Sequence, residues 1–180
     1  FTISPLYFIV FCTGSDPWKS SRFRSIPGAS GRPMNLAFLG KGRLTFRSNK
    51  RFFSSDFGRT WPRTTTPKKT SDGFSFSQEG NAWVDRDKAG KVKAILELGW
   101  HYAPGKKHPR DDATVVFRRS VDGGRKWIDE LSPTQWKFTM QHGGKTWLRG
   151  VSEGAIVRAA NGDLVAALRS DMPPSFFDGP

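Results

Sequence analysis

The chain has 180 residues, 36% of them hydrophobic, with seven Trp and fifteen Phe. This length suits one core-bearing domain, and the aromatic composition excludes an intrinsically disordered segment. A formal net charge of +13 makes nucleic acid the first partner to consider. The 29 Lys and Arg are, however, spread along the chain. Such a distribution is typical of a generally basic surface, or of a protein that binds an acidic small substrate or glycan.

Short strand-like runs recur along the chain, separated by Gly, Pro, Asn or Asp turns. The segment 4–14 resembles the end of a signal-peptide core, but it has no preceding basic residues and is roughly half the ~20 residues that a membrane span needs. A buried strand at 6–11 is therefore favoured as the first run. We expect further strands at 34–38, 43–47, 51–55, 82–87, 92–98, 114–120, 155–159 and 163–169, with loops at 62–73 and 98–112. With 19 Gly and 12 Pro, this pattern predicts an all-β sandwich, barrel or propeller.

Two of the turns carry the same polar frame, S-x-D-x-G-x-x-W. It reads SSDFGRTW at 54–61 and SVDGGRKW at 120–127, each time after an aromatic strand. In such a turn Ser and Asp hydrogen-bond to the backbone, Gly supplies a positive φ and Trp packs beneath. The residues concerned are Ser54, Asp56, Gly58, Thr60 and Trp61 in the first copy, and Ser120, Asp122, Gly124 and Trp127 in the second. A third frame at 140–147 keeps Gly144, Thr146 and Trp147, and we interpret it as degenerate or coincidental.

The repeated frame resembles the Asp box, or BNR repeat, of sialidases and related β-propellers. The resemblance implies an all-β, partial six-bladed propeller of sialidase type, with structural boxes at the blade periphery. One such domain would cover 1–180 and hold about half of the blades. Both ends of the chain look cut, so we expect a fragment of a longer protein, inactive on its own.

The segment 152–171 is predicted to form a hairpin around Asn161–Gly162. A two-residue turn places Glu153 and Arg169 on opposite faces, whereas a three-residue loop with a bulge at Gly162 places them directly across from each other. Such a pair is either a salt bridge that closes a strand end or part of a site.

The resemblance to sialidases implies roles for both residues. Glu153 would be the base that activates a tyrosine nucleophile, and Arg169 would be one of three arginines that clamp the substrate carboxylate. A neutral tyrosine avoids the repulsion that a carboxylate nucleophile would meet at the acidic sugar. Arg24, in FRSIP at 23–27, is the candidate for the first arginine of this triad.

The pattern departs from the family in two respects. The expected Phe/Tyr-Arg-Ile-Pro motif contains an extra serine, and no aspartate lies between Arg24 and Asp56 to serve as the acid/base. The remaining aspartates before the second box are Asp85, Asp111 and Asp112. The third arginine and the tyrosine are expected beyond Pro180.

The aromatic residues of 98–112 are a second candidate for sugar binding. Trp100, His101 and Tyr102 form either a sugar-stacking platform or a surface loop around a buried Trp.

Three hypotheses follow. The first is a sialidase-like glycoside hydrolase that cleaves terminal sialic acid or a related acidic sugar from glycans; the alternative is a non-catalytic Asp-box propeller that binds glycans or proteins. The third, a nucleic-acid-binding module, would need basic and aromatic residues interleaved on one face, which the sequence does not show. With one cysteine, Cys12, and three scattered histidines, we expect no metal site and no cofactor. The compartment is not settled by the sequence, although a secreted or periplasmic location suits this class.

Overall fold

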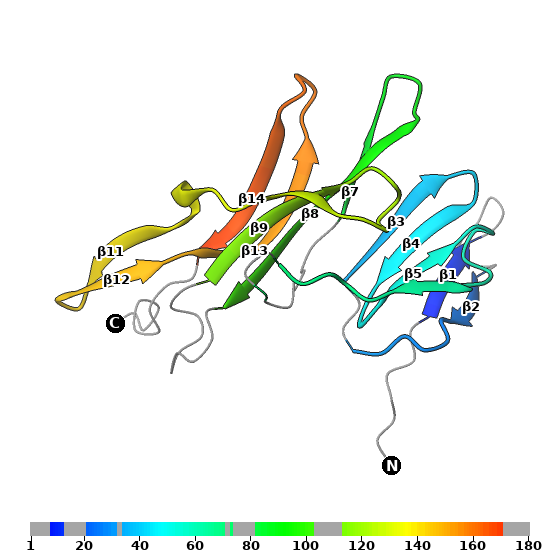
Figure 1. Ribbon diagram of the computed structural model, residues 1–180, viewed down its shortest axis with the longest axis horizontal. Coiled ribbons are helices and arrows are strands. Elements are labelled where there is room, and N and C mark those ends of the chain that lie inside the picture. The colour runs from blue at the N-terminus through cyan, green and yellow to red at the C-terminus, as the bar shows by residue number, and fades with distance from the viewer. Residues whose placement is uncertain are drawn as a thin grey trace, which may run out of the picture.

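The computed structural model describes residues 8–12, 21–31, 34–70, 73, 82–102 and 113–170. These residues form antiparallel β-sheets together with one short 3-10 helix, so the all-β prediction is confirmed. Within these ranges the sheets do not close into a barrel. Figure 1 shows an elongated arrangement in which one hairpin extends away from the remaining sheets.

Two four-stranded sheets form the centre of the molecule. The first has the order β3 (Asn35–Gly40), β4 (Arg43–Arg47), β5 (Arg51–Ser54) and β6 (Arg63–Thr65). The second has the order β7 (Trp83–Arg86), β8 (Val92–Tyr102), β9 (Ala113–Ser120) and β10 (Ile128–Leu131). Each is therefore a meander in which consecutive strands are neighbours.

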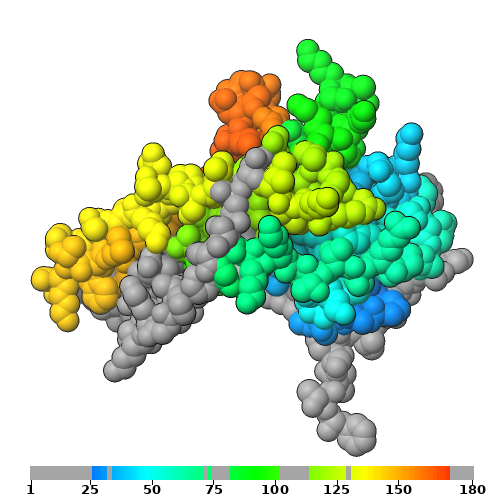
Figure 2. Space-filling view, viewed as in Figure 1, coloured from blue at the N-terminus to red at the C-terminus, as the bar shows by residue number. Residues whose placement is uncertain are grey.

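Among the described residues, three two-stranded hairpins accompany these sheets. They pair β1 (Phe8–Cys12) with β2 (Ser21–Ser25), β11 (Phe138–His142) with β12 (Lys145–Arg149), and β13 (Val151–Arg158) with β14 (Leu164–Ser170). The 3-10 helix η2 (Thr134–Trp136) lies between β10 and β11. In the space-filling view the β13–β14 turn (orange) and the β7–β8 turn (green) project from the same side of the molecule (Figure 2).

The nine predicted runs all overlap strands of the structure, but two predicted loops are partly wrong. The segment 62–73 contains β6, which pairs with β5, and β8 continues to Tyr102 in the segment predicted as the loop 98–112. β6 has only three residues, and polar runs such as Arg63–Thr65 carry no apolar alternation that would reveal a strand. The strands β2, β10, β11 and β12 were not predicted.

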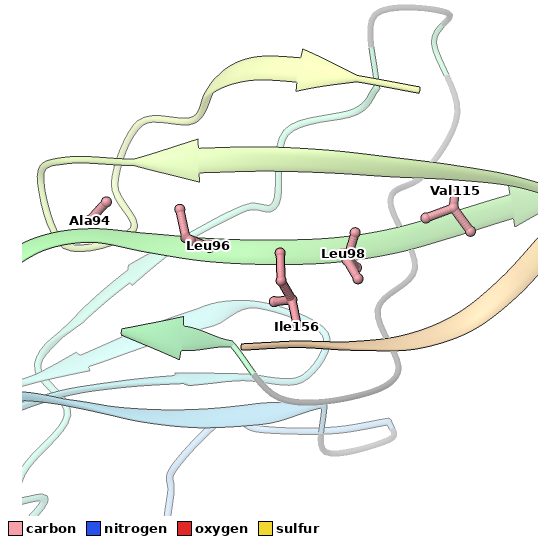
Figure 3. Close-up of a cluster of buried hydrophobic side chains, with 5 residues drawn as sticks. All are labelled: Ala94, Leu96, Leu98, Val115 and Ile156. Atoms are coloured by element: carbon pink, nitrogen blue, oxygen red, sulfur yellow. The ribbon is translucent and has the colours of Figure 1, made fainter. Parts of the chain in front are cut away.

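The second sheet is covered on both faces because the residues of β8 alternate between two partners. Leu96 and Leu98 pack with Ile156 of the β13–β14 hairpin, as Figure 3 shows. Ile95, which is fully buried, packs instead with Ala37 and Leu39 of β3. The three sheets therefore stack face to face in the order β3–β6, β7–β10, β13–β14.

Candidate functional site

The two S-x-D-x-G-x-x-W frames form equivalent turns at equivalent places. One joins β5 to β6 and the other joins β9 to β10, so each connects the third strand of a four-stranded sheet to the fourth. In each copy the serine hydroxyl accepts a hydrogen bond of 2.8 Å from the glycine backbone N–H four residues later. The same side-chain arrangement thus closes corresponding turns in successive sheets.

The aspartate of the first turn is held by its neighbours in the chain. Asp56 accepts hydrogen bonds from the backbone N–H of Thr60 at 2.9 Å, from the Thr60 hydroxyl at 2.7 Å and from the Ser54 hydroxyl at 2.8 Å. These bonds, led by those from Thr60, lower the pKa of Asp56 to about 2. The carboxylate of Asp56 therefore stays ionised at neutral pH, and it stabilises the turn as a hydrogen-bond acceptor.

The second turn repeats this pattern. Asp122 accepts hydrogen bonds from the Ser120 hydroxyl at 2.9 Å and from the backbone N–H groups of Arg125 at 3.0 Å and Lys126 at 2.9 Å. Burial acts to raise the pKa of Asp122, but the hydrogen bonds from Lys126, Ser120 and Arg125 outweigh it, and the pKa lies below its ordinary value.

The tryptophans of the two frames pack inward. Trp61 donates from Nε1 to the Gly58 carbonyl at 3.1 Å and lies edge-on to Phe46, with 6.3 Å between the ring centroids. Trp127 packs against the cluster between the first two sheets. Trp147 of the third frame donates instead to the His142 carbonyl, across the β11–β12 hairpin, so that frame forms a different turn.

The β13–β14 hairpin follows the three-residue-loop register. Arg158 pairs with Leu164, the Ala159 N–H donates to the Asp163 carbonyl at 2.8 Å, and Gly162 has a φ of +95°. The ladder then shifts by one residue, because Ser152 pairs with Arg169 and Gly154 pairs with Leu168. Glu153 is the extra residue of this bulge, so it is not directly across from Arg169 as the regular register predicts.

Glu153 and Arg169 nevertheless meet. Arg169 Nη1 lies 2.9 Å from Glu153 Oε1, and the side chains are 51% and 40% exposed for Arg169 and Glu153 respectively. A bulge re-aims a side chain relative to the regular ladder, which explains how the pair forms despite the shift. The result is a solvent-accessible carboxylate and guanidinium side by side at the open end of the hairpin.

Asp85, one of the three candidates for the catalytic acid/base, forms an ion pair with Arg158. Both of its carboxylate oxygens accept hydrogen bonds from Arg158, at 2.7 and 2.9 Å. This pairing holds the pKa of Asp85 below its ordinary value, so the residue is a poor proton donor. Asp111 and Asp112 lie outside the described residues.

Two further predictions concern residues that the structure places only in part. Arg24 lies on β2 opposite Ile9, and its side chain is outside the described part of the chain. Trp100 and His101 belong to β8 rather than to a surface loop; Trp100 packs against the core and His101 is buried. They therefore do not form an exposed sugar-stacking platform, and the side chain of Tyr102 is not described.

A buried ionic group that was not predicted from the sequence lies between the first two sheets. Glu97 of β8, which is fully buried, pairs with Arg51 of β5, and its second oxygen lies 3.8 Å from Arg118 Nη2 on β9. The sequence does indicate such a group, because Glu97 is the one charged residue in the apolar run AILELGW. A charge inside a strand that is buried on both faces requires a partner.

No protein-family model, curated protein or solved structure matches this chain. Across the described ranges no three His, Cys, Asp or Glu side chains gather as a metal site would require. The helical content of the same ranges includes no segment long and apolar enough to cross a membrane.

Proposed function

We propose that this chain is part of a sialidase-like glycoside hydrolase that cleaves terminal sialic acid or a related acidic sugar from glycans. The observation that carries the proposal is the contact between Glu153 and Arg169 at the accessible end of the β13–β14 hairpin. A guanidinium binds the carboxylate of an acidic sugar through its planar fork. A carboxylate beside it serves as the base for a tyrosine nucleophile.

The scaffold supports the same proposal. Two four-stranded meanders and a hairpin stack face to face, and the first two carry equivalent Ser-Asp-Gly turns between their third and fourth strands. Successive blades of a β-propeller are four-stranded antiparallel sheets of this kind, packed around a common axis. In this proposal the two frames are Asp boxes with a purely structural role, and the first two sheets are blades.

The alternative function is a non-catalytic propeller that binds glycans or proteins. Two observations favour it: no aspartate lies between Arg24 and Asp56, and Asp85 is engaged by Arg158. A sialidase-type reaction needs an acid to protonate the leaving oxygen, and no described aspartate is an obvious candidate for that role.

Hydrolysis of a fluorogenic sialoside by the full natural chain that carries these residues tests the proposal. Glu153→Ala is expected to lower kcat/KM by roughly 10²- to 10⁴-fold, the usual contribution of a positioned acid or base. Arg169→Ala is expected mainly to raise KM, because it removes a contact with the substrate carboxylate. Arg59→Ala, which changes an exposed arginine within the first Ser-Asp-Gly turn, is the matched control and should leave both constants unchanged.

Full activity of Glu153→Ala would rule out the assigned role of that residue. A folded wild-type protein that binds sialylated oligosaccharides but releases no product would support the binding propeller instead.

A further inference from the structure

Two neighbouring turns of the first sheet contain backbone strain. Among the residues that the structure describes, only Lys41 and Phe57 have a positive φ without being glycine, at 51° and 60°. Lys41 lies in the β3–β4 turn and Phe57 in the β5–β6 turn, at the same end of the sheet (Figure 1). The turns touch, because the Phe57 N–H donates to the Gly42 carbonyl at 2.7 Å and the Phe57 ring packs over Gly42. A left-handed backbone is costly for a residue with a large side chain, so the cost is concentrated in one place.

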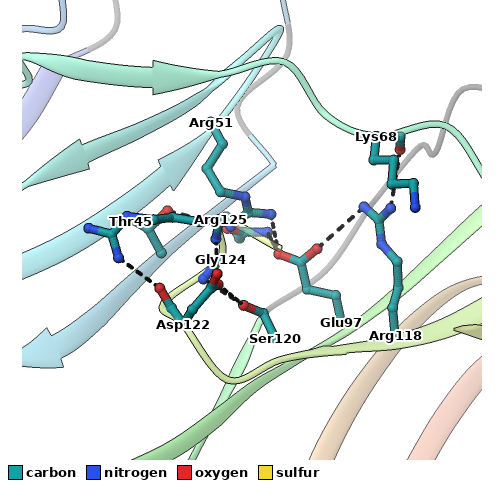
Figure 4. Close-up of polar contacts among 10 residues, drawn as sticks. Thr45, Arg51, Lys68, Glu97, Arg118, Ser120, Asp122, Gly124 and Arg125 are labelled. Atoms are coloured by element: carbon teal, nitrogen blue, oxygen red, sulfur yellow. Dashed lines mark hydrogen bonds and ion pairs between the residues drawn. The ribbon is translucent and has the colours of Figure 1, made fainter. Parts of the chain in front are cut away.

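The second Ser-Asp-Gly turn shows that the strain at Phe57 is avoidable. Its equivalent position holds Gly123, with a φ of +79°, which a glycine adopts at no steric cost. This turn keeps the hydrogen bond from the Gly124 N–H to the Ser120 hydroxyl without an aromatic residue, as Figure 4 shows. A phenylalanine is therefore not needed to form the turn. Strain that the local structure does not require is typical of functional positions.

The ring of Phe57 is exposed and lies beside a second exposed phenylalanine. Phe38 of β3 and Phe57 are 48% and 54% exposed, with 6.5 Å between their ring centroids and 25° between their planes. Leu36, on the same face of β3 as Phe38, is 49% exposed. Together these side chains expose on the order of 300 Å² of apolar surface, which is the size at which a surface patch often has a binding role.

Basic side chains lie beside this apolar patch. Lys41 and Arg59 are both exposed; Lys41 precedes the glycine that the Phe57 ring covers, and Arg59 follows Phe57 by two positions. The formal charge of +13 counts every acidic residue of the chain. The protein as a whole therefore attracts an anionic surface, wherever its individual carboxylates lie.

We propose that Leu36, Phe38, Lys41, Phe57 and Arg59, which we call the aromatic tip, bind the surface of an anionic lipid bilayer. Phenylalanine and leucine enter the boundary between headgroups and acyl chains, and lysine and arginine bind anionic headgroups. The β3–β4 turn (sky blue) projects from the edge of the molecule, where a flat surface can reach it (Figure 2). The cavities between the first two sheets are lined by other residues, so the tip is the end of two turns and not a groove for a peptide or a sugar chain.

The aromatic tip is separate from Glu153 and Arg169. The tip belongs to the first sheet, Glu153 and Arg169 belong to the third, and the second sheet lies between them. The proposal therefore does not depend on the glycosidase assignment.

Co-sedimentation of the full natural chain with phosphatidylcholine vesicles, with and without phosphatidylserine, tests the proposal. We expect saturable binding to the vesicles that contain phosphatidylserine, weaker binding as salt is added, and little binding to phosphatidylcholine alone. Lys41→Gln/Arg59→Gln is expected to weaken binding by roughly fivefold for each basic residue lost. Lys126→Gln/Lys145→Gln removes the same charge from exposed positions elsewhere and should leave the Kd within about twofold of wild type.

Phe57→Gly separates binding from packing, because it gives the first turn the glycine of the second. Loss of the exposed ring is expected to weaken vesicle binding on the order of tenfold. Relief of the strained φ should keep Tm at or above the wild-type value. Val121→Gly, which removes a 62% exposed side chain from the second turn, is the matched control and should leave the Kd within about twofold of wild type.

Weaker binding by Phe57→Gly with an unchanged or raised Tm supports the proposal, and wild-type binding by this variant overturns it. If its Tm falls, Phe38→Ser decides, because Phe38 is exposed and lies on a regular strand: weaker binding supports the proposal and wild-type binding overturns it. No binding by the wild-type chain, equal binding with and without phosphatidylserine, or equal Kd values in the two charge variants would also overturn it. The tip would then be assigned to a protein partner or to packing.

Discussion

Arg158 of β13 holds Asp85 of β7 by both carboxylate oxygens, through Nε at 2.7 Å and Nη2 at 2.9 Å. A bidentate pair of this kind is among the stronger and more specific side-chain contacts. It connects the β13–β14 hairpin to β7, an edge strand of the second sheet, beside the apolar contacts that Ile156 makes with β8. The position of the hairpin, and hence of Glu153 and Arg169 at its end, depends in part on this pair.

Breaking this pair should destabilise the protein in a way that depends on pH. Asp85→Asn and Arg158→Gln are each expected to lower Tm, and the double variant should lose little more than the worse single variant, because both remove one interaction. Folding lowers the pKa of Asp85 from its ordinary value of 3.8. The stabilisation that the ionised carboxylate contributes is therefore complete above pH 3.8, and it is lost as the pH falls through the lower pKa of the folded state. Thermal unfolding from neutral to acid pH should show the wild-type and Asp85→Asn curves converging below about pH 3.8. A constant difference at all pH values would contradict this assignment.

The Ser-Asp-Gly turns should depend on their serines. Ser120 is fully buried, and its hydroxyl is the acceptor for the Gly124 N–H at 2.8 Å. Ser120→Ala leaves that buried donor unsatisfied and is expected to lower the free energy of unfolding by about 1–3 kcal/mol in urea titrations. Ser55→Ala, at an exposed position within the first turn, is the control and should have almost no effect.

Gly124 and Gly162 allow backbone strain to be separated from crowding. Their φ angles are +93° and +95°, but a Cβ at Gly124 would lie 3.1 Å from Arg51 Cδ, whereas nothing lies within 4 Å of a Cβ at Gly162. Gly162→Ala should therefore cost only the strain of a positive φ, about 1–2 kcal/mol. Gly124→Ala should cost more, because Arg51 must also move. Equal costs measured by chemical denaturation would show that Arg51 yields without penalty.

Gly154 provides a packing test at the bulge beside Glu153. A Cβ there would lie 2.5 Å from Leu168 Cδ2 and 3.2 Å from the Ala167 carbonyl oxygen. Gly154→Ala is expected to destabilise the protein by about 1–3 kcal/mol, the usual cost of overpacking. The double variant Gly154→Ala/Leu168→Ala should be less destabilised than the sum of the two single variants, because Leu168 no longer obstructs the new methyl group. Additive effects would place the strain in the backbone.

Local rules predicted much of this fold from the sequence. Alternating or continuous apolar runs marked nine strands, and the repeated frame predicted two turns whose hydrogen bonds are equivalent in the structure. The short polar strand β6 was not predicted, because its pairing with β5 defines it as a strand and its own composition does not. The bulge at Glu153 was not predicted either, because the turn at Asn161–Gly162 indicates only a regular register, and no local pattern in the sequence indicates the shift between Ser152 and Gly154.

The candidate sites differ in how far the sequence could reveal them. Glu153 and Arg169 belong to one hairpin, so the turn at Asn161–Gly162 brings them together whichever residues lie elsewhere. Arg51 and Glu97 come from different sheets, and their contact depends on how those sheets stack. No local pattern encodes that stacking, although the isolated charge at 97 indicated that a partner was needed.

The alternation along β8 has a consequence for how this strand can be inserted between its neighbours. Its odd-numbered residues Ile95 and Glu97 face the arginine-rich sheet, and its even-numbered residues Leu96 and Leu98 face an apolar hairpin. A slip of one position would bury a carboxylate among leucines and would leave Arg51 opposite an aliphatic side chain. A shifted register therefore loses favourable contacts on both faces of β8 at once, and this disfavours misaligned pairings of the strand.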